Sequence, residues 1–152
     1  NGQYYANSYE HDGTGHVTDH ADKSREKVEK RLRKVQSIES VVPPPVTYGD
    51  TDAELTLVTW GTTKGAVISV METLRLQGKK VRVVTFPWIY PFPVSATKEI
   101  LGKAKRAVVI EQNATGQLAW LIRAETGIDI AEKFIKYDGR TWLPEELLEK
   151  LK

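Results

Sequence analysis

Three histidines lie at positions 11, 16 and 20, among carboxylates at positions 10, 12 and 19. Imidazole and carboxylate groups carry protons and can ligate metals near neutral pH. The spacings could suit a metal ion, but Gly13 and Gly15 favour a loop without the rigid frame that a metal site needs. We therefore predict no metal here. We expect His11 and Asp12 to make substrate-side contacts, as a pair that reaches into the active site of another chain.

A second candidate site follows an apolar run, where Gly61, Thr62, Thr63, Lys64 and Gly65 precede another apolar pattern. Backbone amides at the start of a helix, together with Lys64, could hold a phosphate or a carboxylate. The spacing matches neither the phosphate-binding loop of nucleotidases nor the dinucleotide fingerprint. A tight strand-to-helix turn with a threonine cap explains the same residues. The loop is therefore a candidate anion site or interface.

A third candidate is the polar stretch from Glu111 to Gln117, which follows another apolar run. Gln112, Asn113, Gly116 and Gln117 could orient a ligand or a neighbouring chain. The alternative is a loop whose side chains satisfy their own backbone. Both alternatives stay open at this point.

Two other segments are less specific. The aromatic loop at residues 88–93 predicts partial burial against another chain, because aromatic residues are enriched at interfaces. The segment 22–34 contains seven lysines or arginines, but its acids interrupt the patch. A solvated helix face therefore explains it better than nucleic-acid binding.

The elements that must position these residues can be read from periodicity. Residues 1–20 lack an amphipathic period and predict an extended or irregular arm. Residues 21–40 predict a helix, because apolar residues recur along one face from Val28 to Ile38. Asp19 or Asp22 could cap its start.

The prolines at 43–45 cannot continue a helix and mark the clearest boundary. We therefore divide the chain into two parts. Residues 1–45 form an arm, a helix and a proline-rich connector from a preceding domain, and residues 46–152 form an α/β domain.

Strands and helices alternate in the second part. The predicted strands are residues 55–60, 81–86, 107–111 and a shorter one at 134–137, with a last helix opening at Pro144. The first three are apolar runs rather than alternating patterns, which is typical of strands buried on both faces. The pattern predicts a three-layer α/β/α sandwich with a mostly parallel or mixed sheet.

Composition narrows the possible functions. The 152 residues include no cysteine, which excludes disulfides, cysteine-ligated iron–sulfur clusters and cysteine nucleophiles within this chain. The net charge of +2 gives no argument for nucleic acid, and no apolar run suits a membrane span. We expect a cytoplasmic protein. The chain does not begin with methionine, so an earlier part is also expected.

Five motifs in order resemble the α chains of 2-oxoacid:ferredoxin oxidoreductases. They cover nearly the whole chain and are the Glu-His-Asp motif at 10–12 with the basic segment 28–34, residues 57–65, the Pro-Phe-Pro at 91–93, residues 111–118, and residues 136–140. The resemblance implies a domain similar to the C-terminal domain of transketolase, with about five strands. Either residues 46–48 or residues 128–130 would supply the fifth strand at an edge.

The resemblance also implies an activity. The parent enzyme would convert a 2-oxoacid, coenzyme A and oxidised ferredoxin to acyl-CoA, carbon dioxide and reduced ferredoxin. Thiamine diphosphate, magnesium and iron–sulfur clusters would be bound elsewhere in the complex, by other domains and by β, and in some members γ and δ, subunits. The metal-binding signature of thiamine enzymes is incomplete here, since Gly49-Asp50-Thr51 stops short of it. This piece alone would be inactive and would serve assembly and alignment of the active site.

Two alternatives remain from the sequence. The chain could be the equivalent domain of another thiamine enzyme, such as a transketolase or a 2-oxoacid dehydrogenase component. It could instead be a stand-alone regulatory domain that binds an anion or a nucleotide through Lys64 and the Gln112–Asn113 loop.

Overall fold

The computed structural model describes residues 2–152, apart from the side chain of Glu39. Asn1 lies outside the described residues, so the expectation that further chain precedes it is not tested. The chain divides into two compact units, Asn1–Val41 and Val42–Lys152. The origin of residues 1–45 in a preceding domain stays a prediction.

The first unit is a small hairpin followed by a helix. Strands β1 (Glu10–His11) and β2 (Val17–Thr18) pair antiparallel, so the arm contains more regular structure than its lack of period predicts. The physical reason is a tight turn, in which the Asp12 amide donates to the His16 carbonyl at 2.8 Å. The two terminal guanidinium nitrogens of Arg31, Nη1 and Nη2, donate to the carboxylate of Glu10, which ties the helix to the hairpin.

Helix α1 (Ala21–Glu39) confirms the predicted helix to within one residue. Its start differs from the prediction, because the N-cap residue is His20 and no side chain caps the helix. Neither Asp19 nor Asp22 therefore serves as the cap. The predicted apolar stripe is only partly buried, since Val28 and Leu32 keep about half of their surface exposed (46% and 59%).

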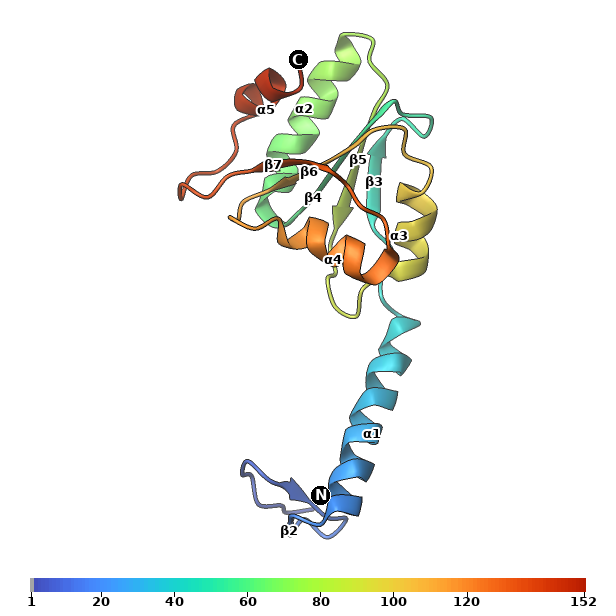
Figure 1. Cartoon of the computed structure of the whole chain (residues 1–152), viewed down its shortest axis with the longest axis vertical. Coiled ribbons are helices and arrows are strands. Elements are labelled where there is room, and N and C mark those ends of the chain that lie inside the picture. The colour runs from blue at the N-terminus through green and yellow to red at the C-terminus, as the bar shows by residue number, and fades with distance from the viewer. Residues whose placement is uncertain (1) are drawn as a thin grey trace. The chain divides into compact units, whose positions relative to one another are not determined.

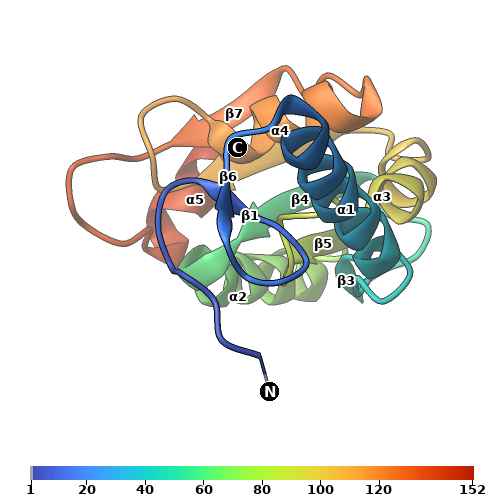
Figure 2. The same ribbon diagram turned by 90° about the horizontal axis from the view of Figure 1, so that it is seen from below.

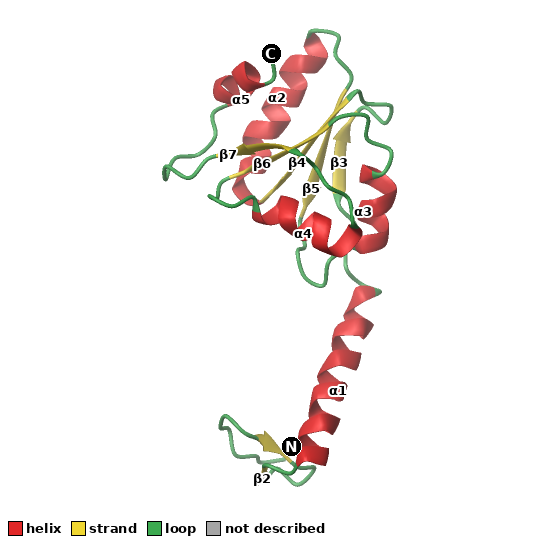
Figure 3. Cartoon of the chain, in the orientation of Figure 1, coloured by secondary structure: helices red, strands yellow, loops and turns green. Residues whose placement is uncertain are grey.

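The second unit is the predicted three-layer sandwich around a five-stranded mixed sheet (Figures 1 and 3). In spatial order the strands are β3 (Val46–Gly49), β5 (Val81–Phe86), β4 (Leu55–Trp60), β6 (Ala107–Glu111) and β7 (Glu132–Ile135). Strand β3 runs antiparallel to β5, and the other pairs are parallel. Figure 2 shows β3 and β7 at the two edges of this sheet.

Helices cover both faces of the sheet. They are α2 (Lys64–Leu76), α3 (Val94–Leu101), α4 (Gln117–Thr126) and α5 (Pro144–Lys150), and a 3-10 turn, η1 (Gly61–Thr63), precedes α2. Helices α2 and α5 lie on one face, and α3 and α4 on the other (Figure 1). Each face buries its own apolar core. Leu57 and Val58 are neighbours on β4, yet both are fully buried, one in each core. Burial on both faces explains the continuous apolar runs.

Two strand predictions need correction. The edge strand is β3, at Val46–Gly49, so the alternative at residues 128–130 is wrong. Ile130 is nevertheless buried at 4% exposure, because the connector after α4 packs its side chain into the core against α3 and α4. The last strand is Glu132–Ile135, two residues earlier than the segment 134–137 predicts. Over the described residues, no helix has both the length and the apolar character that a bilayer crossing requires.

Candidate functional site

The two central strands end at the same edge of the sheet, which brings two predicted loops together. Strands β4 and β6 are parallel neighbours, so the Gly61–Lys64 turn and the Gln112–Gln117 loop meet. The Thr63 hydroxyl donates to the Gln112 Oε1 atom at 3.2 Å. The cleft between them has a volume of about 320 Å³ and is lined by Trp60, Gly61, Thr62, Thr63, Gln112, Asn113 and Gln117. Six of these seven residues belong to the loops that the sequence indicated.

Glu111 ends β6 with a fully buried side chain. Its Oε2 atom accepts the Leu118 amide at 2.8 Å, and its Oε1 atom accepts the Ala119 amide at 3.1 Å. The Asn113 side-chain amide donates to Oε2 as well, at 2.7 Å. These amides belong to the first turn of α4, where backbone donors have no partner within the helix. The carboxylate therefore holds α4, and it is not available to a ligand.

Asn113 is used in the same way. Its Oδ1 atom accepts the backbone amides of Thr115, Gly116 and Gln117, at 2.7 to 3.2 Å. Gly116 has a φ of +67°, the left-handed conformation that this turn requires. The hydrogen bonds within the loop therefore explain why Asn113 and Gly116 occupy these positions. Among the cleft-lining residues of this loop, Gln112 and Asn113 are half-buried and Gln117 is exposed.

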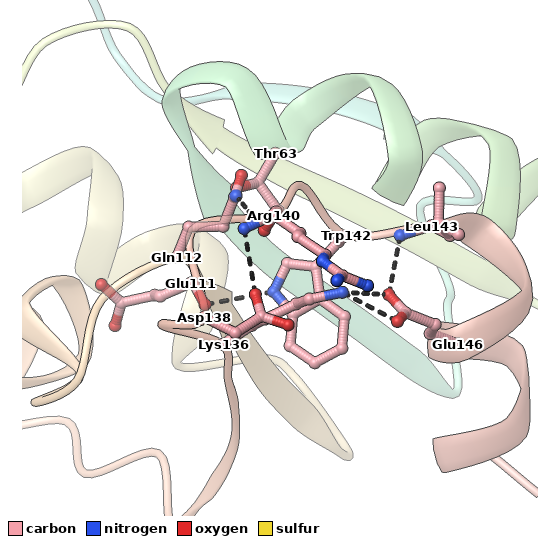
Figure 4. A network of polar contacts seen from close by, with 9 residues as sticks. All are labelled: Thr63, Glu111, Gln112, Lys136, Asp138, Arg140, Trp142, Leu143 and Glu146. Atoms are coloured by element: carbon pink, nitrogen blue, oxygen red, sulfur yellow. Dashed lines mark hydrogen bonds and ion pairs between the residues drawn. The ribbon is translucent and has the colours of Figure 1, made fainter.

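Gln112 joins three segments that are distant in the sequence. Besides accepting from Thr63, it donates through Nε2 to the Arg140 carbonyl at 2.9 Å (Figure 4). The buried Trp142 indole donates to the Glu111 carbonyl at 3.1 Å. Gln112 and Trp142 thereby hold the loop between β7 and α5 against the end of β6.

A charged pair continues this network on the next helix. Lys136 donates to both carboxylate oxygens of Glu146, at 2.8 and 2.6 Å, and the same carboxylate accepts the Leu143 amide at the start of α5 (Figure 4). The Leu143 amide, with Lys136, lowers the pKa of Glu146. Sequence reasoning placed Lys136 in a family motif but missed Trp142 and Glu146, because contacts such as Trp142 to Glu111 join residues 31 positions apart and leave no local pattern.

The ammonium of Lys64 contacts an aromatic ring, whereas an anion site would need it to face the cleft. Its ammonium lies 5.5 Å from the centre of the Tyr48 ring, a cation–π arrangement, and its side chain is exposed. The predicted threonine cap is wrong, since Thr63 makes no capping bond and gives its hydroxyl to Gln112 instead.

An apolar groove lies beside the cleft. It has a volume of about 480 Å³ and is lined by Trp60, Ile89, Thr115, Gln117, Leu118, Trp120 and Leu121. Trp120 keeps 67% of its surface exposed although its indole borders this groove. The aromatic loop, residues 88–93, contributes Ile89 to the groove, and its other aromatic residues differ in burial. Phe92 is buried against Phe86, while Tyr90 is 70% exposed.

In the first unit, the side chains of His11 and Asp12 have different hydrogen-bond partners. The Nδ1 atom of His11 lies 3.2 Å from the Asp12 backbone carbonyl. The Asp12 carboxylate instead accepts the hydroxyl and the amide of Thr14, which lower its pKa to about 2. It also accepts the amide of His16 at 3.1 Å.

The residues present do not fit the cofactors of a thiamine-dependent oxidoreductase. With no cysteine in the sequence, the chain has no thiolate for an iron–sulfur cluster. Within residues 2–152, no group of three or more His, Cys, Asp or Glu side chains could hold a metal ion. The two loops at the sheet edge offer one amine, Lys64, and its ammonium lies over an aromatic ring.

The chain resembles known proteins over nearly its whole length. It is 31% identical to the 2-oxoacid:ferredoxin oxidoreductase subunit alpha of Saccharolobus solfataricus, across 94% of this chain and 23% of the relative. It is 35% identical to subunit alpha of the 2-oxoacid:ferredoxin oxidoreductase 2 of Aeropyrum pernix, across 86% of this chain and 21% of the relative. The chain therefore spans less than a quarter of the length of these relatives.

Solved structures give the same result. The 2-oxoglutarate:ferredoxin oxidoreductase of Magnetococcus marinus, solved with 2-oxoglutarate, coenzyme A and succinyl-CoA bound, aligns with a TM-score of 0.83 and 27% identity. The alignment covers 98% of this chain and 26% of that one. The alpha chain of a probable 2-oxoacid ferredoxin oxidoreductase from Thermoplasma acidophilum is 35% identical, with a TM-score of 0.50. That alignment covers 71% of this chain and 93% of the other.

The family model for the pyruvate:ferredoxin oxidoreductase core domain II matches residues 53–147, from the connector before β4 to the middle of α5. This range includes both loops at the sheet edge and the groove beside them. The motifs in the sequence and the five-stranded sandwich agree with this match. The chain therefore belongs to the pyruvate:ferredoxin oxidoreductase core domain II family.

Proposed function

We propose that this chain is part of a 2-oxoacid:ferredoxin oxidoreductase. The complete enzyme would convert a 2-oxoacid, coenzyme A and oxidised ferredoxin to acyl-CoA, carbon dioxide and reduced ferredoxin. The observation that carries the proposal is the alignment with the Magnetococcus marinus enzyme, which extends over 98% of this chain and so includes both compact units. A shared sandwich alone would support only a shared fold.

Within that enzyme, this chain would serve assembly and alignment of the active site. The cleft between the Gly61–Lys64 and Gln112–Gln117 loops would face another part of the enzyme, as would the groove beside it. Trp120 is exposed in this chain and would become buried on binding to a partner domain. Buried aromatic side chains often dominate the binding energy of an interface, so Trp120 supports this role. The occupant of the groove would be another domain of the same α chain, because the relatives are more than four times as long as the segments that match this chain.

Thiamine diphosphate, magnesium and iron–sulfur clusters would be held by other domains or by the β, γ and δ subunits. For the clusters, the absence of cysteine from the sequence supports that division. Coenzyme A and ferredoxin would then bind at the level of the complex. The turn that carries His11 and Asp12 is the candidate for contact on the substrate side, with Asp12 acting through its neighbours.

The test is reduction of ferredoxin by the assembled oxidoreductase, measured with 2-oxoglutarate, pyruvate and a branched-chain 2-oxoacid in turn. We expect reduction that requires both the oxoacid and coenzyme A, and no activity from the 152-residue chain alone. An assembled complex that reduces ferredoxin with none of these oxoacids would contradict the proposal.

A further inference from the structure

A hydrogen-bonded series of three side chains in the first unit includes two residues, Thr14 and His16, that have no role in the function proposed above. It consists of Asp12, Thr14 and His16, in the turn between β1 and β2. The Thr14 Oγ1 atom lies 2.6 Å from the Asp12 Oδ1 atom and 2.9 Å from the Nδ1 atom of His16. A carboxylate, a hydroxyl and an imidazole are thus linked in series.

The proton positions in this series follow from the inventory of donors. A hydroxyl carries one hydrogen, and a carboxylate can only accept. At 2.6 Å, the Thr14 hydrogen must point to Asp12, because two bare oxygens would repel each other at that distance. The contact to His16 then needs a hydrogen on Nδ1. In the neutral ring, the lone pair consequently lies on Nε2.

The surrounding backbone holds His16 in place. The Asp12 carboxylate accepts the His16 amide at 3.1 Å, and the Asp12 amide donates to the His16 carbonyl at 2.8 Å. The Tyr5 ring lies beside the imidazole, with the ring centres 6.4 Å apart. Side chain and backbone of His16 are therefore both fixed by the same turn, which is the condition for a defined proton-transfer geometry.

His16 also borders a cleft within the first unit. The cleft has a volume of about 640 Å³ and is lined by Gly2, Gln3, Tyr4, Tyr5, Thr14, Gly15 and His16. This volume lies in the range of roughly 300–1,000 Å³ that small-molecule sites occupy. The lining includes no carboxylate and no amine, so His16 is the lining side chain that can take up a proton near neutral pH.

We propose that His16 accepts a proton from a thiol bound in this cleft, and that Asp12 and Thr14 are positioning residues. The S–H bond breaks and its electron pair stays on sulfur, which becomes a thiolate. The Nε2 lone pair forms the new N–H bond. The resulting imidazolium keeps its Nδ1–H bond to the Thr14 hydroxyl, which in turn donates to the Asp12 carboxylate. In hydrolase triads the carboxylate accepts the Nδ1–H bond directly, whereas here the hydroxyl relays it.

The choice of a thiol rests on the proposed function. Formation of an acyl-CoA consumes the coenzyme A thiol and releases its proton, so the reaction needs a proton acceptor. The tautomer of His16, in contrast, depends only on the geometry of this chain.

The first test is nitrogen-15 NMR of the imidazole rings in the full 152-residue chain at neutral pH. The neutral ring of His16 should carry its hydrogen on Nδ1. Thr14→Ser should keep this tautomer, because serine retains the hydroxyl, whereas Thr14→Val should shift the ring toward Nε2–H. A wild-type ring protonated on Nε2, or a Thr14→Val spectrum equal to that of the wild type, would overturn the inference.

The second test uses the assembled oxidoreductase. His16→Gln should lower kcat for acyl-CoA formation by about 100-fold, a typical effect of losing a general base, with little change in the KM for the 2-oxoacid. His20→Gln, outside the relay, should leave kcat at the wild-type value. An active complex in which His16→Gln keeps the wild-type kcat overturns this inference alone. An inactive wild-type complex instead contradicts the proposed function, and the NMR result still decides the relay.

Discussion

Glu111 ends a central strand with a buried carboxylate that serves the backbone of the next helix. Its two oxygens accept the Leu118 and Ala119 amides, and its partner Asn113 occupies three more amides of the same turn. These contacts explain why the loop is so polar, and why most of that polarity is unavailable to ligands. At the residue scale, the hydrogen-bond partners of a polar side chain after a strand must therefore be known before that side chain is assigned to a binding site.

Replacement of this carboxylate should destabilise the second unit. Glu111→Ala leaves two buried amides without acceptors, and we expect a loss of about 3 kcal/mol in the free energy of unfolding, since bonds to charged groups contribute roughly 1.5–3 kcal/mol each. Urea unfolding followed by circular dichroism measures the loss. Glu125→Ala, on the exposed side of the same helix, is the matched control and should change little. Equal midpoints for both variants would contradict the assigned role of Glu111.

The turn around Asp12 should depend on pH in a defined window. The Thr14 hydroxyl and amide lower the pKa of Asp12 from 3.8 to about 2. A carboxyl whose pKa is depressed by folding contributes stability above its unfolded pKa, and this contribution is lost as pH falls toward the folded pKa. Below pH 4, the amide shifts of Thr14 and His16 should therefore titrate with a midpoint near pH 2.

Asp12→Asn is the control for that titration. It keeps an oxygen acceptor but has no proton to bind in this range, so the same amide shifts should be flat between pH 4 and 2. A midpoint near 3.8 in the wild-type chain would show that the turn does not favour the carboxylate.

At the scale of elements, the edge strand β3 depends on a close approach at Gly49. This residue has a φ of +88°, and a Cβ atom there would lie 2.3 Å from the Val81 carbonyl oxygen and 2.7 Å from the Met71 sulfur. Gly65, in the first turn of α2, has open space around the same position. The two glycines therefore differ in what a methyl group would meet.

We expect opposite effects from the two alanine substitutions. Gly49→Ala should destabilise the fold by more than about 1 kcal/mol, because the backbone conformation and the space both exclude the side chain. Gly65→Ala should be neutral or should stabilise by up to about 1 kcal/mol through helix propensity. Thermal unfolding of both variants tests this, and a stable Gly49→Ala variant would contradict the antiparallel pairing of β3 with β5 at this position.

At the scale of the whole molecule, the groove should act through association rather than through folding. Trp120→Ser should weaken binding of this chain to the remaining domains of the oxidoreductase by at least about tenfold, as expected for an aromatic anchor. Its unfolding midpoint should stay close to the wild type, because Trp120 is mostly exposed in this chain. Glu125→Ser, on the same helix, is the control. Unchanged affinity for Trp120→Ser, measured by calorimetry, would exclude the groove as the contact.

Much of the fold was predictable because its signals are local. Three strands are largely apolar runs without strict alternation, which is typical of burial on both faces, so residues 55–60, 81–86 and 107–111 indicate the sandwich directly. The antiparallel edge strand was harder, since Val46 is 40% exposed and the strand pairs along one side only. The hairpin in the first unit escaped prediction because it is held by turn contacts that produce no periodicity.

The sequence by itself determined the order of the elements, the layered architecture and the family, because apolar periodicity and short motifs each depend on only a few consecutive residues. Only the tertiary structure decided which polar residues remain available. Glu111, Asn113 and Asp12 are occupied by backbone amides, whereas Trp120 borders a groove and His16 borders a cleft. The physical reason is that hydrogen-bond satisfaction depends on partners brought together by folding, such as Glu111 and Trp142, 31 residues apart.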